Sequence, residues 1–312
     1  MARLQRSPTL AFEIRPRAPY RLDLTVAAAR RRDVNPLDRW ETGALRRTLD
    51  VDGAAREVTV RQTGPAEEPL LRVEVGGDLP PGQVPVVRAA LDRLLGVTVD
   101  MAPFATWAAA EPDRAALAAR FAGMRPPRTP TVFETLAFAI CCQQLTLARG
   151  LVLVGRLVAE AGGPRFAGDP YPAFPTPGAV AKVPAERWAE LGFSRMKARA
   201  LAEASRAIAA GELDLEALAD HPDEAVQERL CALYGVGRWT SDVVLLRGLG
   251  RLHVFPRGDS GALGGLARWA GLGRRPDPSA IDAILGAWRP YGGLLYMHLL
   301  LDGLRSRGDL PS

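Results

Sequence analysis

The stretch that decides the fold is Leu230-Cys-Ala-Leu-Tyr-Gly-Val-Gly-Arg-Trp-Thr-Ser-Asp242, where Gly235 and Gly237 stand two positions apart between two helical patterns. Glycine adopts backbone angles closed to other residues, and without a side chain it lets a phosphate approach the main chain. The first amides of the second helix add the positive end of the helix dipole. Such a hairpin between helices can hold a DNA backbone without reading its sequence. The same spacing also suits a tight helix-to-helix connection that binds nothing.

The chain changes character near position 113. Before it, apolar and polar residues alternate in short segments, which predicts strands at Leu22–Val26, Glu57–Arg61 and Leu70–Val75. Apolar residues recur instead at helical spacing over Val84–Leu95, so one helix is expected there. The first part of the chain is therefore expected to be a small antiparallel sheet with a helix.

From Asp113 onward, apolar residues recur every three or four positions and the strand pattern fades. Arg125-Pro-Pro-Arg-Thr-Pro130 predicts a stiff loop, because proline lacks an N–H donor and disfavours helix in the preceding residue. The next helix is expected from Thr131 to about Cys142. The fold class is therefore α+β, with an α+β domain over residues 1–112 and an all-α domain over residues 113–312.

Two segments carry a family resemblance. Leu233-Tyr-Gly-Val-Gly-Arg-Trp-Thr240, followed by His253-Val-Phe-Pro-Arg-Gly-Asp259, resembles the helix-hairpin-helix and the aspartate of the 3-methyladenine DNA glycosylase II family. Further similar segments follow the family order over most of residues 130–300: Phe133–Thr146, Phe174–Pro177, Leu191–Arg199 and Trp288–Tyr291 with His298. The first hundred residues resemble the N-terminal module of that family by layout.

The resemblance implies a helix-hairpin-helix glycosylase domain and a monofunctional DNA glycosylase of base excision repair. Such an enzyme flips a damaged nucleotide out of double-stranded DNA and hydrolyses its N-glycosidic bond. The implied substrates are alkylated bases such as 3-methyladenine. The residues expected to contact the DNA are those of the hairpin: Gly235, Val236, Gly237, Arg238 and Thr240.

Asp259 is the candidate catalytic carboxylate. Positive charge builds on the sugar as the glycosidic bond breaks, and a carboxylate near C1′ stabilises that charge and orients the attacking water. Asp259 also precedes Ser260-Gly-Ala-Leu, where an aspartate caps a helix for purely structural reasons. Asp242 is a rival carboxylate, although its spacing from Arg238 favours a structural role on the helix.

A flipped nucleotide leaves a gap in the duplex that a side chain must fill. The resemblance assigns this wedge to Gln144, with Leu145 as the neighbouring candidate. The competing interpretation places Leu145 in the core and Gln144 at a solvated helix end.

Aromatic faces bind cationic alkylated bases well. Trp239 and Tyr291 are the candidates for the base pocket by position in the pattern, although most tryptophans in helical proteins are packing residues. Two residues depart from the family: Tyr234 stands where a proline precedes the first hairpin glycine, and Leu300 replaces a pocket tryptophan. The base-binding surface is therefore expected to differ.

Glycosylases that also cut the strand use an amine nucleophile. In related helix-hairpin-helix enzymes this lysine follows the second glycine by two positions, where this chain has Trp239. The only lysines, Lys182 and Lys197, are distant from the hairpin in sequence. No lyase activity is therefore expected.

Composition also limits which ligands, metals and cellular locations are expected. The chain has 312 residues and a formal charge of +5, a modest excess carried by arginine that suits phosphate binding. Three cysteines and three histidines lack metal spacing, so neither a metal nor a cofactor is expected. The sequence has no signal-peptide pattern and no long apolar run, which favours a cytoplasmic protein that does not bind membranes. A monomer is expected.

Three other functions stay open at this point. The altered pocket also fits a glycosylase for a deaminated or oxidised base. A non-catalytic protein would use the hairpin to bind DNA and Asp259 only as a helix cap. An alkylation-sensing regulator is disfavoured, because no attached DNA-reading segment or methyl-accepting cysteine is recognisable.

Overall fold

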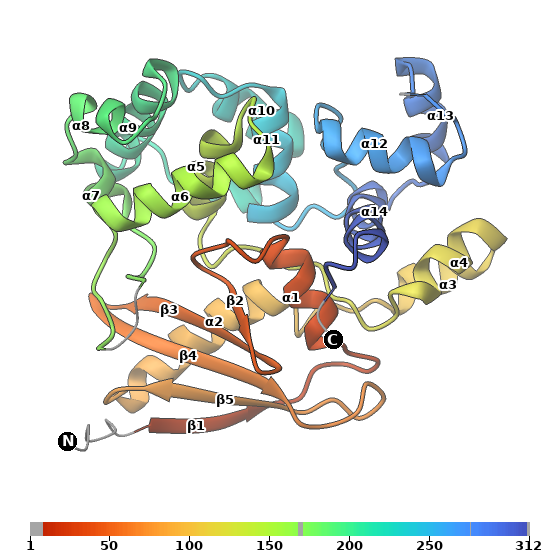
Figure 1. Ribbon diagram of the computed structural model, residues 1–312, viewed down its shortest axis with the longest axis horizontal. Coiled ribbons are helices and arrows are strands. Elements are labelled where there is room, and N and C mark those ends of the chain that lie inside the picture. The colour runs from red at the N-terminus through yellow and green to blue at the C-terminus, as the bar shows by residue number, and fades with distance from the viewer. Residues whose placement is uncertain (1–8, 168–170, 275, 311–312) are drawn as a thin grey trace.

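A computed structural model describes residues 9–167, 171–274 and 276–310 (Figure 1). Its N-terminal part is a five-stranded antiparallel sheet of order β1-β5-β4-β3-β2. The strands are β1 (Thr9–Ile14), β2 (Arg39–Glu41), β3 (Ala44–Val51), β4 (Ala54–Gln62) and β5 (Leu71–Gly76). Buried and exposed residues alternate along β5, as expected of a sheet covered on one face. The predicted antiparallel sheet is confirmed.

Helix α2 (Val84–Leu95) covers this sheet, and its bounds are those predicted from the apolar spacing. Val87, Leu91, Leu94 and Leu95 lie in one core cluster with the apolar strand residues. Gly96 ends the helix in the left-handed conformation that favours glycine.

The strand predicted at Leu22–Val26 is wrong: these residues begin helix α1 (Leu22–Arg30). The helix is buried on two sides, because Leu22 and Val26 pack in the sheet core while Leu24 packs in a core of the helical part. Burial on both sides produces apolar residues at alternate positions, which imitates a strand. The run Ala27–Ala29 favours helix and decides the outcome.

The rest of the described chain is helical, as predicted, and holds no strand after β5. The helices are α3 (Ala102–Ala109), α4 (Pro112–Arg120), α5 (Val132–Cys142), α6 (Leu147–Ala161), α7 (Pro177–Ala181), α8 (Ala185–Glu190), α9 (Arg195–Ala209), α10 (Asp223–Cys231), α11 (Arg238–Val243), α12 (Ser260–Trp269), α13 (Pro278–Ala287) and α14 (Gly292–Ser306). Short turns at Pro81–Gln83, Ala217–Asp220 and Val244–Gly248 complete the order, the last continuing α11 as a π-helix. The boundary at 112/113 stays a prediction.

The helices form two groups above the sheet, with α5–α11 on one side and α12–α14 on the other (Figure 1). Each group has its own apolar core. Helix α1 lies between the sheet and both groups, and it contacts α14. The end of α1 therefore lies where the two groups meet.

A buried ion cluster joins the sheet to the helices. Arg47 on β3 donates to Asp38 at 2.6 Å and to both oxygens of Glu134 on α5 at 2.6 and 2.5 Å. Glu134 lies in the first turn of α5, where Thr131 accepts a hydrogen bond from its backbone N–H. Because the side chains of the cluster are almost fully buried, removing one partner leaves charge unpaired in the interior. This cluster sets α5 against the sheet.

Candidate functional site

The two hairpin glycines, Gly235 and Gly237, have different structural roles. Gly235 has a φ of +73°, and an added Cβ would lie 2.9 Å from Cβ of Ala200. Gly237 precedes the first residue of α11 in extended conformation, and an added Cβ would meet nothing within 4 Å. Gly235 is thus required by the turn and its packing, whereas Gly237 leaves the start of α11 open to a ligand.

One side chain ties the hairpin to the end of α5, and a second holds that end in place. The side-chain amide of Gln143, just after α5, donates to the carbonyl of Gly235 at 2.8 Å and to the hydroxyl of Thr240 at 2.9 Å. Lys197 on α9 donates to the carbonyls of Ile140, Cys141 and Gln143 at the end of α5, at 2.7, 3.0 and 2.7 Å. The end of α5 and the hairpin therefore form one hydrogen-bonded unit.

The predicted hairpin residues face different ways. The side chains of Val236 and Thr240 are buried, which leaves only their backbone groups for a ligand. The Arg238 side chain is 72% exposed, although it pairs with Asp242 at 3.1 Å. Arg238 and the amides near Gly237 are the accessible part of the hairpin.

Asp259 is held by two hydrogen bonds. It precedes α12, where its Oδ1 accepts from the backbone N–H of Ala262 at 2.9 Å, so the predicted cap is present. Its Oδ2 accepts from the hydroxyl of Tyr296 on α14 at 3.3 Å. Burial raises the pKa of Tyr296, and the Asp259 charge adds to this, so the phenol stays a donor at neutral pH. The carboxylate is fixed from two helices.

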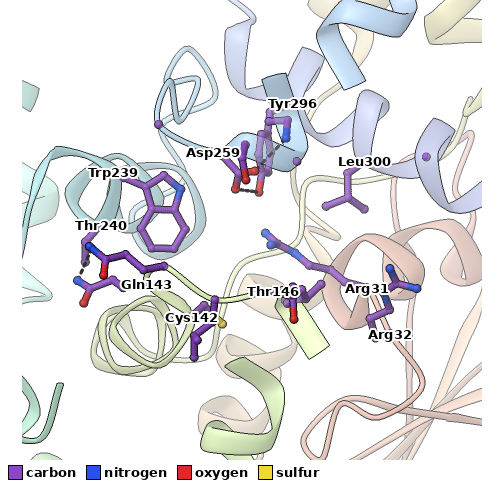
Figure 2. Close-up of a pocket in the computed structure, with 18 of the residues that line it drawn as sticks. Arg31, Arg32, Cys142, Gln143, Thr146, Trp239, Thr240, Asp259, Tyr296 and Leu300 are labelled. Carbon is purple, nitrogen blue, oxygen red and sulfur yellow. Dashed lines mark hydrogen bonds between the residues drawn. The ribbon is translucent and has the colours of Figure 1, made fainter. Parts of the chain in front are cut away.

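A pocket of about 990 Å³ lies where the hairpin, the α5–α6 turn, α12, α14 and the end of α1 meet (Figure 2). Asp259 and Tyr296 line it together with Gln143, Trp239 and Leu300. The structure therefore brings Asp259, the hairpin glycines and one predicted pocket aromatic, Trp239, to a single concavity.

The predicted wedge residues lie at this pocket as well. Gln144 and Leu145 form the turn between α5 and α6, with Gln144 at a φ of +54°, and both line the pocket. Leu145 is 43% exposed, so the interpretation that it belongs to the core is wrong. The Leu145 side chain is therefore accessible to a ligand at the mouth of the pocket.

Tyr291 is the predicted residue that the structure does not bring to the site. It precedes α14 and packs edge-on against Phe104 and Trp107, with Trp288 in the same aromatic cluster. The contacts with Phe104 and Trp107 place Tyr291 against α3, outside the residues that line the pocket. Tyr296, one and a half turns further along, supplies the aromatic side chain that faces Asp259.

The other candidates have structural roles. Asp242 is buried and accepts hydrogen bonds from Gln227 and Arg238, both at 3.1 Å, and it does not line the pocket. Burial raises its pKa, while Arg238 opposes the rise. His298 is buried against Phe104 and Phe121, where burial lowers its pKa to about 4 and keeps it neutral.

Sequence reasoning missed two arginines. Arg31 and Arg32 follow α1 in the sheet part of the chain, yet both line the pocket (Figure 2). Arg31 has a φ of +62°, and the face of the Tyr296 ring lies 5.8 Å from its guanidinium carbon. No pattern near α1 indicated this role, because it depends on how α1 docks against α14.

In the part of the chain that the structure describes, no group of three histidine, cysteine or acidic residues is arranged to hold a metal ion. Among the same residues, no helix is long and apolar enough to cross a membrane.

Comparison with known proteins identifies the family. Residues 137–290 match the model of the HhH-GPD superfamily of base excision DNA repair proteins, and the chain belongs to that superfamily. It is 28% identical over 193 residues to a DNA-3-methyladenine glycosylase of Bacillus subtilis, covering 62% of this chain and 64% of that protein. It is 29% identical over 178 residues to DNA-3-methyladenine glycosylase 2 of Escherichia coli, covering 57% of this chain and 60% of that protein. The predicted family is confirmed.

The similarity in structure extends further along the chain. The 3-methyladenine DNA glycosylase from Archaeoglobus fulgidus matches with a TM-score of 0.81 at 25% identity, covering 95% of this chain and 99% of that chain. The similarity therefore includes the N-terminal sheet, which the sequence matched by layout alone. The sequence alignments span 56% to 64% of the curated relatives' own length.

The contrast between the two hairpin glycines is testable. Gly235→Ala should destabilise the protein by roughly 2 kcal/mol, because alanine at positive φ is strained and its Cβ meets Ala200. Gly237→Ala should cost less than about 1 kcal/mol, the loss expected on replacing a helix-capping glycine. Urea unfolding of both variants measures the difference; equal losses would contradict the assigned roles.

Proposed function

We propose that the protein is a monofunctional DNA glycosylase that excises alkylated bases from double-stranded DNA in base excision repair. The observation that carries the proposal is the Asp259 carboxylate, fixed between α12 and Tyr296 at the wall of a pocket beside the hairpin. The names of the relatives supply the substrate class. If Asp259 only capped α12, its position at the wall of a pocket would have no explanation.

The hairpin would hold the DNA backbone near the lesion. Amides at the start of α11 and the exposed Arg238 offer donors and charge to a phosphate, and Gly237 leaves room for its approach. Gly237→Ala, which should fold, is therefore expected to weaken duplex binding. Because phosphate contacts dominate, affinity should also fall steeply as salt is raised and depend little on sequence.

The extruded nucleotide would enter the pocket while the α5–α6 turn fills its place in the duplex. Leu145 is the better wedge of the two candidates, since its exposed apolar side chain can stack between bases, with Gln144 beside it. Trp239 lines the pocket and offers an aromatic surface to the base.

Asp259 would then act at the sugar. As the bond from C1′ to the base nitrogen breaks, the carboxylate stabilises the positive charge on the sugar and orients the water that attacks C1′. The cap and the Tyr296 hydroxyl hold both oxygens in place beforehand, so the group needs little rearrangement during the reaction.

Asp259→Asn should reduce base release by at least about 100-fold, the loss typical of removing one preorganised electrostatic group. Asparagine also caps helices, so the variant should keep its stability and separate catalysis from folding. Single-turnover release of free base from methylated duplex DNA is the measurement.

Asp242→Asn is the matched control, because Asp242 is a second carboxylate near the hairpin that does not line the pocket. It should affect release far less. Full activity in Asp259→Asn, or equal loss in both variants, would reject the assignment of Asp259 and favour the non-catalytic DNA-binding protein.

The absence of strand cleavage is part of the proposal. Neither lysine lines the pocket. The Lys197 ammonium donates hydrogen bonds to three backbone carbonyls, and Lys182 is exposed at the end of α7. Borohydride added during the reaction should therefore trap no covalent protein–DNA adduct. A trapped adduct, resolved by electrophoresis, would show that the protein has lyase activity.

A further inference from the structure

Three arginine side chains meet near the C-terminal end of α14. An added Cβ at Gly303 would lie 3.5 Å from Nη1 of Arg307 and 3.7 Å from Nη2 of Arg268, so both guanidinium groups lie over this glycine. Arg32 joins them through Asp309, which accepts from Arg32 at 3.1 Å and from Nε of Arg307 at 2.8 Å. All three members of this arginine cluster line the main pocket.

The arginine cluster carries more positive charge than its surroundings neutralise. Among the described residues, Asp309 is the one carboxylate that pairs with it. The Arg268 side chain is exposed and has no ion pair or hydrogen-bond partner in that part of the chain. Arg307 uses its Nε on Asp309, which leaves both of its Nη groups as donors. Because a phosphate accepts well from two guanidinium groups, the cluster has the donors and the charge to bind one.

The arginine cluster and the hairpin lie on different sides of the candidate catalytic carboxylate. Trp239 and Thr240 of α11 lie on one side of Asp259, whereas Leu300 and Arg32 lie on the other (Figure 2). A strand whose extruded nucleotide faces Asp259 would therefore have the hairpin to one side and the arginine cluster to the other.

Helix α14 sets the distance between the cluster and Asp259. Four residues that line the pocket recur at helical spacing along one face of α14: Tyr296, Leu300, Gly303 and Arg307. Gly303 lies two turns, about 10 Å, beyond Tyr296, which donates to Asp259. That length corresponds to roughly three nucleotides of one DNA strand, at about 3.4 Å each. The strand would thus reach the cluster within a few phosphates of the lesion.

A second cavity continues the pocket beyond the cluster. It has a volume of about 290 Å³ and shares Arg31, Arg32 and Leu304 with the main pocket. Asp309 lines it from one side, and Ala148, near the start of α6, lines it from another. The concave surface therefore extends past the space for an extruded base, as a bound strand requires.

We propose that Arg268 and Arg307 form a second phosphate-binding site, which holds the damaged strand on the side of the extruded nucleotide that lies away from the hairpin. The ligand is a DNA phosphodiester, bound by charge-assisted hydrogen bonds that read no base. The proposal rests on the glycosylase function proposed above. A strand held at two places positions the nucleotide between them at Asp259, which lowers the entropy cost of reaching the reacting geometry.

The test measures binding rather than turnover. A duplex with a tetrahydrofuran in place of the damaged nucleotide is prepared in versions that each carry one neutral methylphosphonate linkage, within about three nucleotides of the lesion in either strand. In the wild-type protein, neutralising the contacted phosphate should weaken binding about tenfold, as expected on loss of a hydrogen bond between charged groups. Arg268→Gln should bind the unmodified duplex about tenfold more weakly, and the same neutral linkage should then have no further effect.

Arg305→Gln is the matched control. Arg305 is an exposed arginine at the same end of α14 that does not line the pocket. Arg268→Gln should reduce the slope of log affinity against log salt concentration by about one, the effect of one phosphate contact, whereas Arg305→Gln should leave the slope unchanged. Arg307→Gln should show the same dependence on the same linkage as Arg268→Gln.

The outcomes separate the two proposals. If no linkage depends on Arg268, or if Arg305→Gln lowers the slope equally, the second site is wrong and the glycosylase function stands. Dependence on a linkage in the complementary strand, or on the linkage that Gly237→Ala affects, would overturn the proposed placement. If the predicted dependence is found but the wild-type protein releases no base, the second site stands and the glycosylase function fails. A wild-type protein that does not bind duplex DNA would contradict both.

Discussion

The site depends on the hydrogen bond by which the first turn of α12 holds the Asp259 carboxylate. The backbone N–H of Ala262 donates to one carboxylate oxygen, and Tyr296 from α14 donates to the other. A capping aspartate is common in proteins, because one of its oxygens accepts a hydrogen bond from the first turn of the helix. Here both oxygens accept hydrogen bonds at the wall of a pocket, so the cap that begins α12 also fixes the position of a carboxylate at that pocket.

The pocket exists because three parts of the chain meet at one place. The α5–α6 turn and the hairpin form one wall, held together through Gln143 and Lys197. Residues of α12 and α14 line the pocket as well, and Arg31 and Arg32 at the end of α1 complete the lining (Figure 2). The buried Arg47 cluster fixes α5 against the sheet from which α1 extends. The N-terminal part of the chain thus contributes to the site through Arg31, at the end of α1, as well as through its packing.

Much of this arrangement could be predicted from the sequence. The helix at Val84–Leu95 and the helix predicted from Thr131 to about Cys142 follow local rules of spacing and capping. The hairpin and Asp259 were identified through the family resemblance, and the cap at Asp259 also follows a local rule. The strand predicted at Leu22–Val26 failed because burial on two sides of α1 hides the helical period. Longer-range features could not be predicted. Tyr296 and Arg31 reach the pocket only through the packing of α14 and α1, and no local pattern separates Tyr296 from Tyr291.

The central claim is that Asp259 faces the positive charge that develops on the sugar. It is tested most directly by binding of duplexes in which a cationic pyrrolidine or a neutral tetrahydrofuran replaces the sugar of the lesion. The wild-type protein should bind the cationic duplex at least about 100-fold more tightly, as enzymes bind analogues of their transition states, and Asp259→Asn should lose this preference. If the asparagine variant keeps the same preference, the carboxylate does not face the reacting carbon and the account is wrong.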